Sequence, residues 1–133
     1  MKACQIVRLE ARDLRYPLAH GVGSDSIHRK PEYSFATTLL GTDGGASGTG
    51  IVLTLGQGNE LVCAAIELLG KELVGLEIEE LMASFGSVAH RLEDHSKLRW
   101  LGPHKGVVHL ALASITNACF DLWAKARGLP LWR

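Results

Sequence analysis

The stretch that decides the fold is HKGVVHLALASITNACFDLWAKAR, residues 104–127. Its apolar side chains recur at every turn and cover most of the circumference of a helix. Only a narrow polar stripe remains, formed by Ser114, Asn117, Asp121 and Lys125. Since a surface helix carries a single apolar stripe, the sequence predicts a helix that is central in its own domain or buried against a further body.

Two more helical segments precede this one. Residues 61–73 and 76–92 both place apolar side chains at i, i+3 and i+4 spacing. Residues 97–103 break the pattern, Pro103 lies near the start of the long helix, and Gly128 follows its end. The C-terminal half is therefore expected to be a bundle of three or more helices.

The N-terminal half has the pattern of a small sheet. Residues 6–16 alternate imperfectly between apolar and charged side chains, and residues 33–40 and 50–55 are apolar, β-branched runs. The turn residues 42–45, TDGG, join the second run to the third. Strands followed by helices indicate an α+β fold, here a three-stranded antiparallel meander followed by the helical bundle.

Composition excludes several classes of protein. With 14 basic and 14 acidic residues and 47% hydrophobic residues, the chain is neither a disordered nor a nucleic-acid-binding type. Polar residues interrupt the apolar stretch 107–122, which is shorter than the ~20 residues of a membrane span, and residues 1–13 lack the apolar core of an export signal. Three unpatterned cysteines favour reduced thiols and a cytoplasmic location.

Two motifs suggest chemistry only weakly. Residues 56–61, GQGNEL, follow a strand and precede a helix as in a dinucleotide fingerprint, but Leu61 stands where glycine or alanine is required, so a plain strand-to-helix turn is favoured. His90 and Asp94 are one helical turn apart, yet no third ligand follows at helical spacing, and a solvated helix face is favoured. We predict neither catalytic nor metal-binding residues.

The best functional candidate is the stretch at residues 21–33, most of which belongs to a long predicted loop, residues 18–32, rich in glycine, serine and histidine. Loops of this length are usually functional or disordered. This loop combines hydrogen-bonding side chains with a titratable imidazole, and such a loop can close over a polar ligand and exclude water. A solvent-exposed excursion without a ligand is the alternative.

Four segments resemble the L-fuconate dehydratase family, on the mandelate racemase side of the enolase superfamily. They are residues 23–34, residues 54–58 (TLGQG), residues 98–111 (LRWLGPHKGVVHLA) and residues 117–128. The resemblance runs in order through nearly the whole chain. It implies an N-terminal capping domain, residues 1–128, with residues 129–133 as the start of a missing barrel domain or a linker into it.

In that family two mobile loops of the capping domain close the substrate pocket. The matching positions in this chain are Ser24, Asp25, His28, Tyr33, Thr54, Leu55 and Gly56. His104 falls where relatives tend to carry an acidic residue. The resemblance therefore implies that these two segments act as a lid over an acid-sugar substrate.

The reaction that the resemblance implies is Mg-assisted dehydration of a sugar acid. The proton next to the carboxylate is removed, and the resulting enediolate expels the neighbouring hydroxyl. In the family the metal ligands, acid and base come from the barrel, which needs ~250 residues. We expect no cofactor in this chain, Mg in the parent family, and no turnover by the chain alone.

The apolar last helix and chain end are expected to meet the barrel through Val107, Val108, Leu112, Trp123 and Trp132. The chain ends in LPLWR, which has the pattern of the first turn of a further helix, so we expect a fragment. The alternative is an autonomous module that binds a protein through the same apolar helix. Both interpretations allow self-association.

Overall fold

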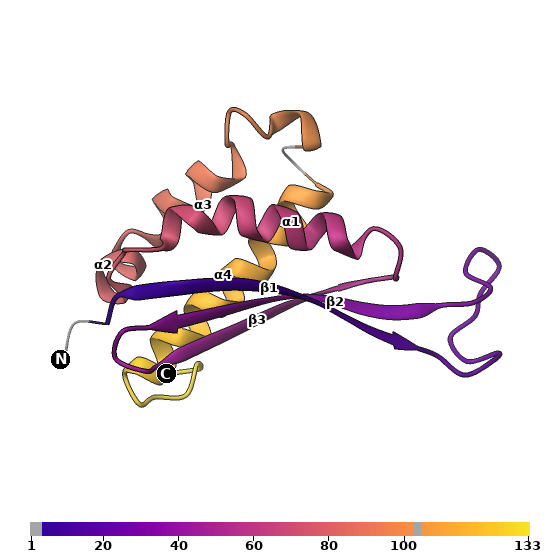
Figure 1. Ribbon diagram of the computed structural model, residues 1–133, viewed down its shortest axis with the longest axis horizontal. Coiled ribbons are helices and arrows are strands. Elements are labelled where there is room, and N and C mark those ends of the chain that lie inside the picture. Colours follow the sequence, from indigo (N-terminus) through magenta and orange to yellow (C-terminus); the bar gives the residue numbers. More distant parts are fainter. Residues whose placement is uncertain (1–3, 103–104) are drawn as a thin grey trace.

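A three-stranded antiparallel sheet forms one layer of the molecule (Figure 1). The computed structural model describes residues 4–102 and 105–133. The strands are β1 (Ile6–Pro17), β2 (Glu32–Thr42) and β3 (Ser47–Thr54), in the spatial order β1-β2-β3. The predicted meander is confirmed.

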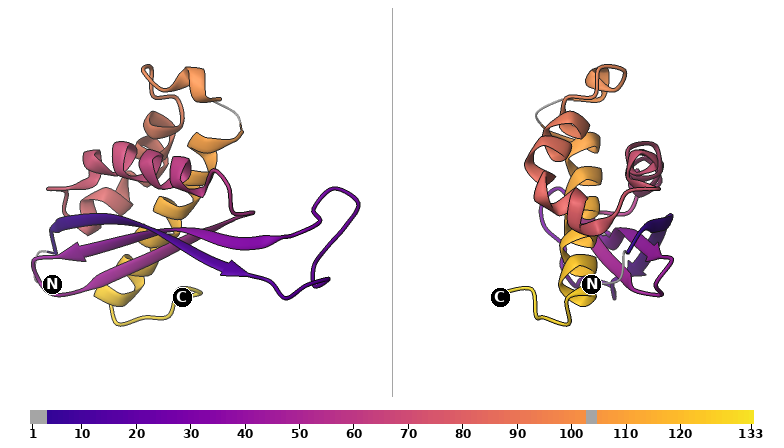
Figure 2. Two further views of the ribbon diagram at one scale, coloured as in Figure 1. Left: turned by 45° about the vertical axis from the view of Figure 1, so that its right-hand side comes forward. Right: turned by 90° about the vertical axis from the view of Figure 1, so that its left-hand side faces the viewer.

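Helices form the second layer, on one face of the sheet (Figure 2). They are α1 (Asn59–Gly70), α2 (Ile78–Ala83), α3 (Phe85–Glu93) and α4 (Val107–Ala126), with the 3₁₀ turns η1 (Lys71–Leu73) and η2 (Arg99–Leu101) between them. The segment predicted as one helix, 76–92, is two helices, because Ser84 leaves helical geometry at φ −121° and ψ 22°. Its hydroxyl bonds back to the Glu80 carbonyl oxygen at 3.3 Å, a bond that competes with regular helix geometry.

Helix α4 is the central helix of the domain. It packs against β3, β2 and α1, and its buried residues follow helical spacing: Val108, Ala111, Ser114, Ile115, Ala118, Cys119 and Leu122. Its length and composition would suit a membrane span, but it serves as a core helix, with 44% of its most apolar window buried. The predicted starting positions, Pro103 and His104, lie outside the described residues.

Two glycines of β3 allow α4 to lie close to the sheet. A Cβ on Gly50 would overlap the Ser114 carbonyl oxygen, and one on Gly48 would lie 2.6 Å from the Leu122 Cβ. The strand therefore begins at Ser47, three residues before the predicted start. Glycine in a strand interior marks the close approach of another backbone here, whereas in the sequence it has the pattern of a turn.

The alternation of side chains divides the sheet into two faces. From the register, Leu9, Ala11 and Asp13 of β1 share the inner face with Leu40, Thr38 and Ala36 of β2. Under the helices the inner face is mostly apolar, with the Thr38 hydroxyl 2.8 Å from Ser114 Oγ of α4, and it becomes more polar toward the β1–β2 hairpin, which extends beyond the helical layer (Figure 1). That polar end is where both candidate lid segments begin.

Candidate functional site

The two predicted lid segments start side by side at the same end of the sheet. The loop 18–31 joins β1 to β2, and residues 55–58 join β3 to α1. Ser34, near the start of β2, pairs with Arg15 on one side and with Thr54 on the other. The strand register thus brings together two segments that are more than 20 residues apart in sequence.

A tight turn at the tip of the loop joins three of the predicted residues. The Asp25 carboxylate accepts the backbone N–H groups of Ile27 (2.8 Å) and His28 (2.6 Å) and lies 2.9 Å from His28 Nδ1. These contacts, led by the His28 N–H, lower the pKa of Asp25 to about 2. The Ser24 hydroxyl donates to the Arg29 carbonyl oxygen at 3.4 Å. The turn therefore presents the His28 imidazole in a fixed place.

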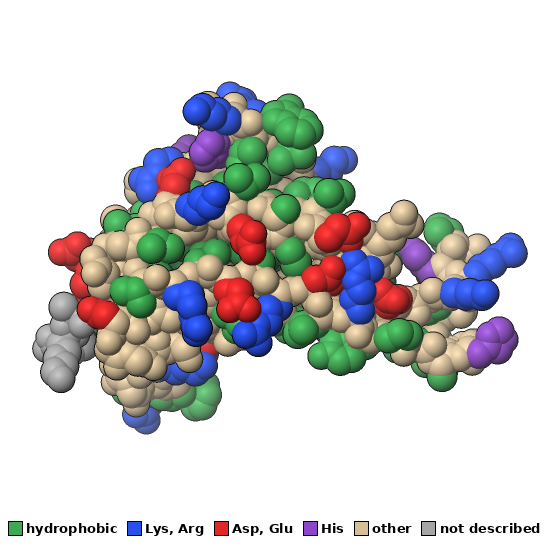
Figure 3. All heavy atoms as spheres, viewed as in Figure 1, with side chains coloured by type: hydrophobic (Ala, Val, Ile, Leu, Met, Phe, Trp, Pro, Cys, Tyr) green, Lys and Arg blue, Asp and Glu red, His purple; other side chains and the backbone are tan. Residues whose placement is uncertain are grey.

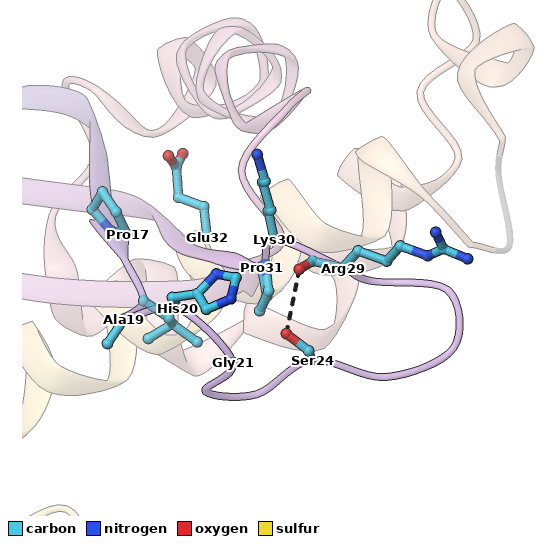
Figure 4. Close-up of a pocket in the computed structure, with 10 residues that line it drawn as sticks. Pro17, Ala19, His20, Gly21, Ser24, Arg29, Lys30, Pro31 and Glu32 are labelled. Carbon is cyan, nitrogen blue, oxygen red and sulfur yellow. Dashed lines mark hydrogen bonds between the residues drawn. The ribbon is translucent and has the colours of Figure 1, made fainter.

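An open pocket of about 260 Å³ lies inside the loop (Figure 4). Its lining comprises Pro17, Leu18, Ala19, His20, Gly21, Ser24, Arg29, Lys30, Pro31 and Glu32. Of the residues predicted for the lid, only Ser24 lines it. Sequence reasoning missed His20, Arg29 and Lys30, although Arg29 and Lys30 are the one adjacent pair of basic residues in the chain.

The lining of this pocket mixes apolar side chains with a few polar and charged ones, among them Ser24, Lys30 and Glu32. The side chains of Lys30 and Glu32 run in the same direction, whereas the Arg29 side chain points away from the pocket (Figure 4). Neither Arg29 nor Lys30 forms an ion pair within the described part of the chain. The Lys30 ammonium and the Ser24 hydroxyl therefore offer this pocket a few hydrogen bonds for a polar ligand.

A chain of hydrogen bonds runs beneath the second lid segment. The Gly56 N–H donates to Ser34 Oγ (2.7 Å), Ser34 Oγ lies 2.6 Å from Thr54 Oγ1, and Thr54 Oγ1 donates to Asn59 Oδ1 (2.5 Å). The amide of Asn59 donates to the Asp13 carboxylate at 2.6 Å. Because the single Thr54 proton goes to Asn59, the Ser34 hydroxyl must donate to Thr54. Every bond in the chain therefore has one defined direction.

Arg15 closes the network at its outer end. Its guanidinium bonds to Asp13 (2.9 Å), Glu32 (3.3 Å) and Glu60 (2.7 Å). The pKa of Asp13 is lowered, first by the Arg15 hydrogen bond and then by Asn59. The pKa of Glu60 is lowered by its own backbone N–H and next by Arg15. In Figure 3 acidic side chains surround a basic one where the loop leaves the body of the molecule.

The second lid segment is a strand-to-helix turn. Gly56 and Gly58 take left-handed φ values of 89° and 93°, and the Gly56 N–H is used by Ser34 instead of facing outward. Of the residues predicted there, Thr54 and Gly56 belong to the hydrogen-bond chain, whereas the Leu55 side chain is half exposed. Tyr33 lies at the base of the other lid segment, opposite Tyr16 in β1.

The predicted barrel-facing residues lie in different environments. Val108 is 1% exposed and belongs to the core of this chain, so it offers no surface to a partner. Val107, Leu112 and Trp123 are half-buried, and Trp132 is 85% exposed. The Trp123 indole donates to Glu79 at 3.1 Å, with the Arg127 guanidinium 4.3 Å from the ring centroid.

The chain end folds back beside α4 without forming a helix. A single hydrogen-bonded turn, Arg133 N–H to the Pro130 carbonyl oxygen at 3.1 Å, replaces the predicted helical turn. Between this end and α4 lies a groove of about 100 Å³ lined by Phe120, Trp123, Ala124, Arg127, Leu129, Pro130, Leu131 and Arg133. Trp132 and Leu131 stand exposed beside it, and they form an apolar surface at the end of the chain.

Neither a metal cluster nor a disulfide occurs in the part of the chain that the structure describes. No group of three His, Cys, Asp or Glu side chains in residues 4–102 and 105–133 is arranged to hold a metal ion. Cys4, Cys63 and Cys119 are free thiols, and burial raises the pKa of Cys119 to about 12.

Comparison with known proteins shows which family this chain resembles. No family model matches the chain. Among curated proteins, an L-galactonate dehydratase of Hypocrea jecorina is 42% identical over an alignment of 134 positions that covers all of this chain. The crystal structure of human mitochondrial enolase superfamily member 1 is 41% identical and superimposes with a TM-score of 0.92 over 98% of this chain. The chain belongs to the enolase superfamily.

This enolase-superfamily chain spans about 30% of the length of those relatives. Its three strands and following helices match the N-terminal capping domain of the superfamily, as the sequence resemblance predicted. A more distant structure, L-talarate/galactarate dehydratase from Salmonella typhimurium LT2 with Mg and L-lyxarohydroxamate, shares the fold at 22% identity. It has a TM-score of 0.73 and covers 98% of this chain and 33% of its own.

Proposed function

We propose that this chain is the capping domain of an acid-sugar dehydratase of the L-fuconate dehydratase type, in which it closes the substrate pocket and sets specificity. The observation that carries the proposal is the placement of both lid segments at one end of the sheet, on one hydrogen-bonded base. The superfamily relationship and the dehydratase among the relatives support it.

The chain's own residues would act by positioning and by excluding water. The loop 18–31 extends beyond the helical layer, so it can lie over a pocket that another body supplies (Figure 1). Its pocket offers Ser24, Lys30 and an imidazole, from His20, to hydroxyl and carboxylate groups. Closure of such a loop removes water from the reacting centre and strengthens the electrostatic contacts there.

The proposed choice of substrate starts from the acid named for the curated relative. L-Fuconate is the 6-deoxy form of L-galactonate, the acid named for the curated relative, so the two acids differ only at the carbon farthest from the carboxylate. A site that hydrogen-bonds a hydroxyl rejects an analogue lacking it, whereas an apolar site discriminates weakly. The lid is therefore the part of the enzyme expected to choose between them.

The chemistry itself is assigned to a barrel domain. The relatives' fold includes structures solved with Mg, such as the talarate/galactarate dehydratase. The described residues of this chain do not fit a Mg site, since no group of three suitable side chains is present among them. Mg bound elsewhere would stabilise the enediolate as a Lewis acid, and we propose that the 133-residue chain alone has no turnover.

The barrel is proposed to bind at the apolar end of the chain and along α4. Trp132, Leu131 and the half-buried faces of Val107, Leu112 and Trp123 are the surface we assign to it. Exposed apolar side chains of this kind mark interaction sites, and without the barrel they would favour self-association. The three free thiols support a reducing compartment, which we take to be the cytoplasm.

The test begins with the coding sequence downstream of codon 133. If an open frame encodes a barrel, the complete product is assayed with Mg on L-fuconate, L-galactonate and galactarate, with detection of the 2-keto-3-deoxy acid. Dehydration by the complete product and none by residues 1–133 is the expected result. A stop codon after Arg133, or ordinary turnover by the 133-residue chain, would refute the proposal, and the stop codon would favour the interaction module.

A further inference from the structure

We propose that Arg15 is a positioning residue that couples the two lid segments, so that the loop 18–31 and residues 55–58 open and close together. The inference rests on the proposed lid function of these segments, and it adds a residue and a mechanism of coupling to it. Arg15 lies on β1, outside both segments and away from the pocket of the loop. Its role would therefore be indirect.

The contacts of Arg15 reach the base of each segment. Glu32, bonded to Arg15 at 3.3 Å, is the first residue after the loop. Glu60, bonded to Arg15 at 2.7 Å, lies in the first turn of α1, directly after residues 55–58. One guanidinium thus holds the end of the first segment and the end of the second.

A second connection strengthens the link to residues 55–58. Arg15 also bonds to Asp13 through Nε (3.0 Å) and Nη2 (2.9 Å). Asp13 accepts the amide of Asn59, which is fully buried and continues the hydrogen-bond chain to Thr54. Displacement of Arg15 would therefore weaken the series of hydrogen bonds that runs from Asp13 through Asn59 to the Gly56 N–H.

Hydrogen-bond geometry and charge both favour arginine at position 15. Its planar fork donates several hydrogen bonds in fixed directions, which a lysine ammonium does not reproduce. Asp13, Glu32 and Glu60 all bond to this one guanidinium, so without its charge three carboxylates would share the site unneutralised, and like charges that share a site repel. Loss of Arg15 therefore both removes the connection and drives the two segments apart.

Hydrogen exchange on the 133-residue chain tests the coupling without substrate. In Arg15→Gln, exchange is expected to become about two- to fivefold faster both at residues 30–34 and at residues 54–58. Amides of α4 should keep their rates, which a general loss of stability would not allow. Arg12→Gln is the matched control, because Arg12 lies on the same strand and has the single carboxylate partner Glu10 at 2.7 Å.

A second variant separates coupling from local damage. Among the described residues, the ion pair of the Glu60 side chain is with Arg15, so Glu60→Gln should speed exchange at residues 30–34 only while Arg15 is present. In the double variant with Arg15→Gln this effect should disappear. If the Arg15→Gln variant does not fold, the coupling is tested by the single variant Glu60→Gln, through its effect on exchange at residues 30–34.

Exchange that rises in only one segment, or equally in α4, would overturn the coupling. So would a Glu60→Gln variant whose effect stays at residues 54–60. The exchange rates are measured on the free chain, so a failure of the coupling would not contradict the proposed dehydratase function. Conversely, absence of turnover in the complete protein would not change these exchange rates.

Discussion

Replacing Asn59 with aspartate is the sharpest test of the polar network. Asn59 is 0% exposed, accepts the Thr54 hydroxyl through Oδ1 and donates to Asp13 through Nδ2. Asn59→Asp keeps the shape and the first bond. It replaces the N–H group that donates to Asp13 at 2.6 Å with an oxygen, so two carboxylate oxygens face each other with no hydrogen between them.

The magnitude follows from the pKa shift of such a pair. Two carboxyl groups that share a site separate their pKa values by about three units, and each unit corresponds to ~1.4 kcal/mol. The Asp13 side chain is 29% exposed and bonds to Arg15, and both facts reduce the repulsion. We therefore expect a loss of about 2 kcal/mol of unfolding free energy at pH 7, or roughly 8 °C in Tm.

The dependence on pH distinguishes charge repulsion from a packing defect. The new carboxyl would have a folded-state pKa raised above its unfolded value of ~3.9. Between these two values the folded variant holds a proton that the unfolded chain lacks, so stability falls as pH rises through this window. The loss relative to the natural sequence should be largest at pH 7 and should shrink toward pH 4, where the protonated carboxyl again donates to Asp13.

Urea denaturation followed by tryptophan fluorescence, at pH 4, 5, 6 and 7, measures this difference. Asn117→Asp is the control, since Asn117 is exposed and makes only a 3.4 Å bond to the Ile51 carbonyl oxygen. Its effect should stay below about 0.5 kcal/mol. A destabilisation by Asn59→Asp that is equal at pH 4 and pH 7 would refute the paired-carboxylate reasoning.

Three further predictions concern the frame and the loop. Gly50→Ala should cost about 3 kcal/mol in thermal unfolding, because its Cβ would overlap the backbone of α4, whereas Gly44→Ala, with open space around it, should change little. Gly86→Ala, in α3 and equally free of close neighbours, should stabilise the chain by about 0.5 kcal/mol in the same scans. The carboxyl carbon of Asp25, followed by NMR, should titrate near pH 2, so the turn to His28 should persist above the ordinary pKa of ~3.9 and be lost only as the pH falls toward 2. Titration near 4 would contradict the observed turn.

Local sequence patterns were sufficient to predict most of the fold. The strand alternation gave the meander, and the apolar circumference of 107–126 correctly indicated a helix at the centre of the domain. These predictions succeed because hydrophobic periodicity reports which side of an element is buried. The same reasoning started the third strand at residue 50 instead of Ser47, since the close approach of α4 to Gly48 and Gly50 depends on tertiary packing that no local pattern contains.

The site was less predictable because its contacts are long-range. Asp13 and Asn59 are 46 positions apart, and Arg15 and Glu60 are 45 apart. Nothing in the sequence around Asn59 distinguishes a buried network residue from an ordinary residue at the start of a helix. The pair Arg29–Lys30 was detectable as a local cluster of charge, whereas its place beside a pocket required the path of the loop.

The polar end of the inner face shows how the fold defines the position of its loops. Along β2 the inward side chains change from Leu40 and Ala36 to Ser34, which is fully buried. An apolar contact tolerates small displacements, but a buried polar group is stable only while its hydrogen bonds are made. Because each hydrogen bond in the chain from Gly56 to Asp13 runs in one defined direction, the network favours one arrangement of the sheet and the start of α1. Polar residues at this end thus give up some hydrophobic stabilisation, and in return the two lid segments start from a single defined geometry.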